Sequence, residues 1–145
     1  MRRLGIVLAV LLAACGGTDG STGSAGPPVC EPTFTAPSRY EPKQTLREEY
    51  ADHVGVHRAF RDELGRELHF FAGIPGEFGE GLPSGGPVEL TEGREGFLLG
   101  RGSQAWLVVW EEGGVCDPRV VVSNGLTRDE FLQALVEAGI APPAG

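Results

Sequence analysis

The chain has 145 residues and carries 20 acidic against 12 basic side chains, a formal net charge of −8 with neutral histidines. A chain this acidic is a poor partner for nucleic acid or for an anionic lipid surface, because both carry negative charge themselves. Its length is enough for one domain with one modest core.

The N-terminus has the pattern of a secretory signal. Two arginines follow Met1, and the next 11 residues, Leu4 to Ala14, contain no polar side chain. A run of this length is too short to cross a bilayer core of about 30 Å as a helix. A short apolar run behind a positive start is typical of a signal peptide, which we predict over residues 1–14. A buried N-terminal helix is the alternative, disfavoured by the flanking arginines and glycines.

The end of that run is more specific. Leu12, Ala13, Ala14 and Cys15 place a branched apolar residue and two small residues directly before a cysteine. This sequence resembles the lipobox of bacterial lipoproteins. The resemblance implies that signal peptidase II cuts before Cys15, that Cys15 carries the lipid, and that the protein is exported. Anchoring would be to the outer face of the cytoplasmic membrane or to the outer membrane, since two or more acyl chains hold a protein stably.

Residues 15–29 read as the lipidated cysteine and a flexible tether. After Cys15 the segment GGTDGSTGSAGPPV has one charged side chain and cannot build a core. Such a tether has an r.m.s. span on the order of 20 Å. Residues 30–145 then form a single domain, and loss of the two signal arginines leaves a net charge of −10.

Two cysteines remain if Cys15 carries lipid. In an exported, oxidising setting we predict a disulfide between Cys30 and Cys116. Closing that loop would stabilise the fold by about 4–5 kcal/mol on the chain-entropy account. Two free thiols or a metal site are the alternatives, and the absence of a C-x-x-C spacing argues against metal.

The first half of the domain predicts one helix and one hairpin. Thr45 and Glu48 have the spacing of a capping box, which indicates a short N-terminal helix over residues 46–53, ended by a glycine. The following stretch fits an amphipathic helix or two strands. Its glycine and its β-branched and aromatic residues favour a hairpin, with strands near 55–62 and 66–72 and a turn at 63–65.

The second half reads as a meander followed by a helix. Residues 73–87 are rich in glycine and proline and indicate a surface loop, because no phosphate-binding motif is present. Apolar runs separated by glycine-rich turns then predict strands, at 88–91, 97–100, 105–111 and 119–123. The run AWLVVWE is apolar on both faces, which predicts a central strand covered on both sides.

A second capping box opens the last predicted element. Thr127 and Glu130 have its spacing, and an apolar stripe follows at helical intervals, formed by Phe131, Leu132, Leu135 and Val136. Gly139 and two prolines end the helix. We expect the stripe to pack on the Leu107 and Val109 face of the central strand.

The fold class that follows is α+β, a small antiparallel sheet with a C-terminal helix packed on one face and a short N-terminal helix. Residues 87–140, with WLVVWEEGG and VVVSNGLTRDEFLQALVEAGI, resemble a small sheet-plus-helix domain of unknown function in bacterial envelope proteins. Some of those proteins are similar to lipoprotein-sorting or anti-sigma regulatory proteins. The resemblance implies the fold and no activity.

Few residues point to a site. His53 and His57 are four apart and would share a face of a helix, where they could bind zinc or copper, but Gly55 lies between them. Trp106 and Trp110 would form one aromatic face of a strand, available for recognition if the helix takes the other face. No catalytic constellation and no cofactor motif is present. We therefore expect a non-catalytic, lipid-anchored envelope protein that binds an envelope protein or small ligand, with metal or small-ligand binding at His53 and His57 as the alternative.

Overall fold

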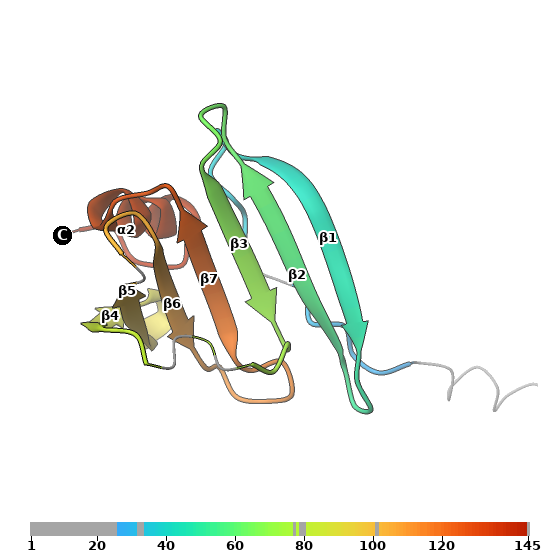
Figure 1. Cartoon of the computed structure of the whole chain (residues 1–145). Helices are drawn as coiled ribbons and strands as arrows, with labels where there is room; N and C mark the ends of the chain where they lie inside the picture. The colour runs from blue at the N-terminus through green and yellow to red at the C-terminus, as the bar shows by residue number, and fades with distance from the viewer. Residues whose placement is uncertain (1–25, 32–33, 77, 79–80, 101, 145) are drawn as a thin grey trace, which may run out of the picture.

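The computed structural model describes residues 26–144 apart from 32–33, 77, 79–80 and 101. These residues form one seven-stranded antiparallel sheet and one α-helix (Figure 1). The elements are β1 (Glu41–Glu49), β2 (Val54–Arg61), β3 (Glu67–Ala72), β4 (Ser84–Glu89), β5 (Glu95–Gly100), β6 (Trp106–Trp110), β7 (Arg119–Asn124) and α2 (Arg128–Glu137). The sheet with a C-terminal helix is thus confirmed. The predicted signal peptide, Cys15 and the tether up to residue 25 lie outside the described residues.

The strand order is β1-β2-β3-β7-β6-β5-β4, so the sheet joins two antiparallel units where β3 pairs with β7. The predicted four-strand meander is confirmed as β4 to β7, with β6 in its centre. Its first strand starts earlier than predicted, because Ser84–Pro87, which we expected in the loop, pair with β5 through a bulge before Gly86. In the part of the chain that the structure describes, no helix is long and apolar enough to span a membrane.

The hairpin predicted for residues 55–72 is confirmed as β2 and β3. Its turn is held by the buried carboxylate of Asp62, which accepts hydrogen bonds from the backbone N–H of Leu64 at 3.0 Å and of Arg66 at 2.9 Å. Gly65 has a φ of 80°, a left-handed conformation that glycine adopts without strain. The glycine was the signal from which the turn at 63–65 was predicted, and the hydrogen bonds of Asp62 are seen only in the structure.

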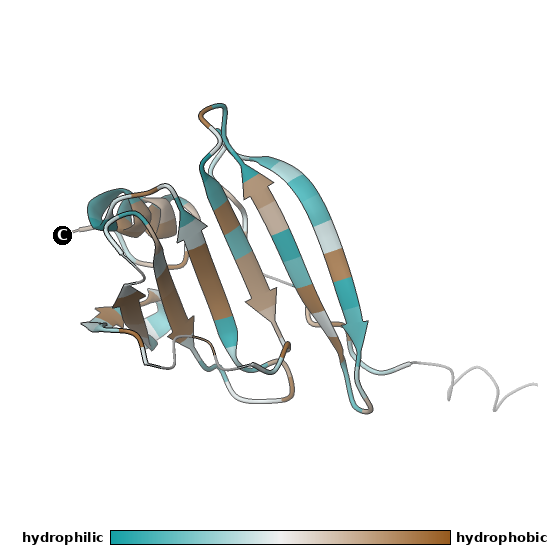
Figure 2. Cartoon of the chain, viewed as in Figure 1, coloured by the Kyte–Doolittle hydropathy of each residue, from teal (hydrophilic) through white to brown (hydrophobic). Residues whose placement is uncertain are grey.

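The predicted N-terminal helix over residues 46–53 is wrong, since this segment belongs to the edge strand β1 and the turn after it. β1 pairs with β2 along its whole length, and Leu46 lies opposite His57. The capping spacing of Thr45 and Glu48 is a local signal only, and the long ladder with β2 outweighs it. All nine residues of β1 are exposed, and the strand is mostly hydrophilic (Figure 2).

The C-terminal helix is confirmed in type and in its start. Thr127 accepts a hydrogen bond from the backbone of Glu130, whose side chain accepts one from the backbone of Thr127, the predicted capping box. Gly139, with a φ of 76°, ends the helix as expected. Phe131 and Leu135 are fully buried at the centre of its apolar stripe.

The helix packs on the face of β6 opposite to the one that we expected. The core beneath α2 contains Val108 and Trp110, whereas Leu107 belongs to a separate cluster on the other face of the sheet. The helix and the segment around Phe34 therefore cover the face of β6 that carries the two tryptophans. Burying this face removes more apolar area from water than burying the Leu107 face would. Both faces of β6 are covered, which confirms the prediction of a central strand.

The predicted disulfide between Cys30 and Cys116 is confirmed. It links two residues that are 86 positions apart, the segment before β1 and the turn between β6 and β7. Val29 also forms a bridge with Val54, which ties the same segment to the start of β2. The disulfide and this bridge hold the described N-terminal segment against the sheet.

Candidate binding surface

The two tryptophans expected to form a recognition face lie on the helix side of the sheet. Trp110 is 6% exposed and packs edge-on against Phe70, with ring centroids 6.3 Å apart. Its indole nitrogen donates to Glu112 at 2.9 Å, and that of half-buried Trp106 donates to the carbonyl of Ser103 at 3.3 Å. Trp110 is therefore part of the core, Trp106 is packed against it in part, and both indole nitrogens have partners.

The structure does not bring His53 and His57 together. The two ring nitrogens of His53 lie 2.7 Å from a carboxylate oxygen of Asp52 and 2.6 Å from the carbonyl of Gly73. The hydrogen bond with Asp52, followed by that with Gly73, raises the pKa of His53 above its ordinary value. The ring also stacks on Tyr50, with centroids 4.8 Å apart. This histidine has no free nitrogen for a ligand.

His57 pairs with the third histidine instead. Its Nε2 lies 3.0 Å from Nδ1 of His69 on the neighbouring strand, and its ring stacks on Phe71 at 4.1 Å between centroids. Burial, and then the charge that His69 can carry, lower the pKa of His57. We missed this pair because the residues are 12 apart, although the register of the predicted hairpin would place both on one face. Among the described residues, no three or more His, Cys, Asp or Glu side chains form a metal-binding group.

The sheet face turned away from α2, which we name the open face, carries a continuous row of side chains across all seven strands. In register order the row is Leu46, His57, Phe71, Val120, Val109, Phe97 and Pro87. Its middle is covered by Phe78 and Leu82 from the loop between β3 and β4. Its two ends are uncovered, because Leu46 is 48% and Phe97 is 56% exposed.

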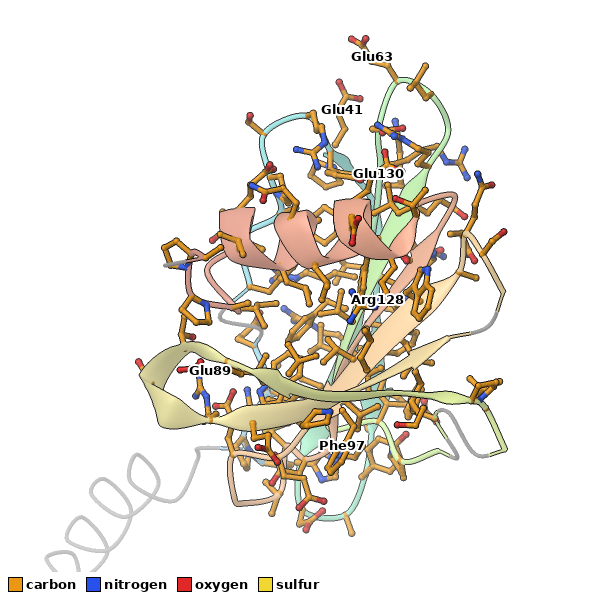
Figure 3. The ribbon with its side chains drawn as sticks, turned by 90° about the vertical axis from the view of Figure 1, so that its left-hand side faces the viewer. Glu41, Glu63, Glu89, Phe97, Arg128 and Glu130 are labelled. Carbon is orange, nitrogen blue, oxygen red and sulfur yellow. A yellow bond between two sulfur atoms is a disulfide. The ribbon has the colours of Figure 1, made fainter. Side chains whose placement is uncertain are left out.

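One end of the row forms a mixed apolar and acidic surface, which we name the Phe97 patch. It consists of Pro87, Glu89, Glu95 and Phe97, all exposed. Gly96 and Leu98, which alternate with the patch on β5, are buried toward the core under α2. The Phe97 side chain therefore points away from the helix, as Figure 3 shows.

The carboxylates of the Phe97 patch have no ion-pair partner among the described residues, whereas the described arginines do. Glu89 and Glu95 take part in no ion pair of the described part. The arginines with a carboxylate within ion-pair distance are Arg39, Arg47, Arg58, Arg61, Arg66, Arg94, Arg119 and Arg128. The positive charge of the described surface is thus largely matched, and several carboxylates remain without an ion pair, among them the two beside Phe97.

Both edges of the sheet carry features that oppose pairing with another strand. β1 has Pro42 and Lys43 beside a bulge, and β4 has Pro87 next to Gly86, whose φ is 92°. Prolines, lysines and bulges interrupt the row of hydrogen-bonding groups that an added strand needs. A partner therefore has a more suitable surface on the open face than along an edge.

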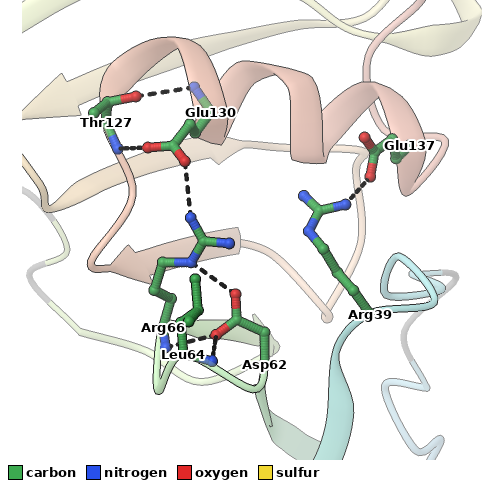
Figure 4. Close-up of polar contacts among 7 residues, drawn as sticks. All are labelled: Arg39, Asp62, Leu64, Arg66, Thr127, Glu130 and Glu137. Carbon is green, nitrogen blue, oxygen red and sulfur yellow. Dashed lines mark hydrogen bonds and ion pairs between the residues drawn. The ribbon is translucent and has the colours of Figure 1, made fainter.

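A second charged cluster, between the hairpin turn and the helix, is internally satisfied. Arg66 donates to Asp62 at 2.7 Å and to Glu130 at 2.8 Å, and Arg39 pairs with Glu137 (Figure 4). Burial alone would raise the pKa of Asp62, but the hydrogen bonds from Arg66 outweigh it and lower that pKa. These pairs fasten the helix to the hairpin, and their charges are used within the fold.

The chain was also compared with known proteins. No protein-family model, no curated protein and no solved structure matches it.

Proposed function

We propose that this chain is an exported, lipid-anchored protein of the bacterial cell envelope whose domain is a non-catalytic binding module. The lipobox-like sequence at Leu12 to Cys15 supports the anchor. The disulfide supports export, because such bonds persist in oxidising compartments. The short helix-and-sheet domain would then act at the membrane surface, tethered through residues 15–29.

The binding surface in this proposal is the Phe97 patch. The observation that carries it is Phe97 itself, a large apolar side chain that is 56% exposed beside two carboxylates without ion-pair partners in the described part. Glu89 and Glu95 lie directly opposite each other, an arrangement of like charges that costs stability. An exposed aromatic residue and a repulsive pair side by side are more useful to a partner than to the fold.

The chemistry of the patch favours one class of partner, a protein segment with an apolar residue flanked by lysine or arginine. Its apolar residue would cover Phe97 and Pro87, and its cations would neutralise Glu89 and Glu95. Complementary charge raises the association rate and selects among partners. Nucleic acid would be repelled by the same carboxylates.

The position of the patch suits a protein held at its N-terminus. The described chain begins at Gly26, beside the β1 and β2 side of the sheet, and the patch lies on β4 and β5 at the opposite end (Figure 1). A tether leaving from the first side would turn the patch away from the lipid surface and toward other envelope proteins.

Photo-crosslinking in native membranes tests the proposed surface. A photoreactive phenylalanine in place of Phe97 should crosslink to one protein, through a segment that contains lysine or arginine. The same group in place of Leu64, which is 76% exposed at the hairpin turn, should not. Equal crosslinking from both positions, or a crosslinked segment without basic residues, would contradict the proposal.

Charge reversal separates the patch from the general acidity of the protein. The double change Glu89→Lys and Glu95→Lys should abolish the crosslink from position 97. The matched change Glu48→Lys and Glu49→Lys on β1 alters the net charge equally and should leave it intact. Loss of the crosslink in both double variants would show that partner binding depends only on the net charge of the protein.

The anchor has its own test. Cys15→Ala should prevent lipidation and processing, so that the protein no longer fractionates as a processed membrane protein. Membrane fractionation and maturation like those of the unchanged chain would rule out the lipid anchor, whatever the result for Phe97.

A further inference from the structure

His57 and His69 lie next to each other on the open face, away from the Phe97 patch. His57 on β2 faces Phe71, and His69 on β3 faces Ala59, so the two imidazoles are diagonal neighbours. Both are partly exposed, and their nearest ring nitrogens are 3.0 Å apart. The His57 ring stacks on Phe71, with centroids 4.1 Å apart.

This separation matches the spacing of two nitrogens that bind one metal ion. Imidazole nitrogens bind zinc at about 2.0–2.1 Å, and two such bonds at a tetrahedral or square-planar angle place the nitrogens about 2.9–3.4 Å apart. These two nitrogens form a hydrogen bond with each other, which a metal ion would replace. The ring that donates this bond would carry its proton on its other nitrogen, and both rings would turn so that their free lone pairs meet at the ion. The β2–β3 ladder fixes the backbone positions of both residues before any metal arrives.

We propose that His57 and His69 form a two-histidine site for a divalent transition-metal ion, with Cu(II) bound more tightly than Zn(II). Imidazole suits both ions, and Cu(II) stands above Zn(II) in the general order of affinities. Water or a donor from another molecule would fill the remaining positions, because the described residues contain no group of three or more metal ligands. The site is independent of the Phe97 patch and of the partner proposed for it.

The charged groups around the pair are compatible with a cation. Glu67 on β3 lies 3.8 Å from Nε2 of His69 and is shared with Arg61 at 2.9 Å. Glu48 on β1 lines the shallow pocket that also contains His57, and Arg47, whose charge is paired with Glu31 at 2.9 Å, lines it as well.

Metal titration of the full-length chain in detergent tests the site. Each sample carries Cys15→Ser, so that the thiol expected to bear lipid cannot bind the metal. Calorimetry with Cu(II), in a buffer that does not coordinate metals, should show one ion per chain, and Zn(II) should bind to the same site more weakly. Either His57→Gln or His69→Gln should abolish this one-to-one binding.

His53→Gln is the matched control, since it removes the one histidine of the chain outside the proposed pair, whose nitrogens already have hydrogen-bond partners. It should leave the one-to-one binding unchanged, and circular dichroism should show the same fold in all variants. Absence of one-to-one binding by the parent chain would overturn the proposal. Binding that survives both His57→Gln and His69→Gln, as binding at the N-terminal amine would, overturns it as well.

Discussion

Glu89 on β4 and Glu95 on β5 lie directly opposite each other, two residues along the strands from the facing pair Pro87 and Phe97. Both carboxylates are exposed, and neither has an ion-pair partner in the described part of the chain. The fold therefore places a repulsive pair of carboxylates beside Phe97, the most exposed aromatic side chain of the sheet.

Removing one charge of this pair should stabilise the isolated protein. Glu95→Gln should raise the free energy of unfolding by about 0.2–1 kcal/mol, because like charges directly opposite on neighbouring strands repel. Urea denaturation measures the change. Glu49→Gln on β1, where the residue faces Val54, is the control and should have a smaller effect. A loss of stability in Glu95→Gln would mean that the pair is not repulsive.

The apolar stripe of the helix should dominate its contribution to stability. Leu135 is 1% exposed, and Leu135→Ala should lower the free energy of unfolding by about 2–5 kcal/mol. Gln133→Ala, at an exposed position of the same helix, should change it by less than about 0.5 kcal/mol. Thermal or urea unfolding of the two variants decides the matter, and similar stabilities would contradict the packing of α2 on the sheet.

The two tryptophans should differ in their contact with solvent. Trp110 is nearly buried and Trp106 is half-buried, so acrylamide should quench the fluorescence of Trp110→Phe, which retains Trp106, more strongly than that of Trp106→Phe. Equal and strong quenching of both variants would mean that the helix does not cover this face of β6. Each variant keeps an aromatic ring at the changed position, which limits the disturbance of the core.

His53 and His57 should titrate on opposite sides of the ordinary imidazole pKa of 6.5. His53 should have a higher pKa because its partners favour the charged ring, and its contribution to stability is lost as the pH rises through that pKa. His57 should have a lower pKa because of burial. Its contribution is present above about pH 6.5 and is lost as the pH falls toward its folded pKa, since the unfolded chain takes up the proton first. NMR titration of the imidazole resonances measures both, and the reverse order would be inconsistent with these contacts.

The sequence by itself determined the features that depend on a few neighbouring residues. The capping box at Thr127 and the stop at Gly139 define the helix, and Gly65 marks the turn of the hairpin. The cysteine count, together with the expectation of export, was enough to pair Cys30 with Cys116. These signals act over one turn of chain or through composition, so no tertiary contact is needed to read them.

Only the tertiary structure decided which partner each of these elements has. Residues 41–49 form β1 because β2 offers them a full ladder, a contact that a local capping pattern cannot report. The helix could have packed on either apolar face of β6, and the choice of the tryptophan face left Phe97 exposed on the other. His57 meets His69 rather than His53 because the antiparallel register of β2 and β3 places them on one face. Which residues of different strands lie close together follows from register and burial, and these arise from all contacts of the sheet together.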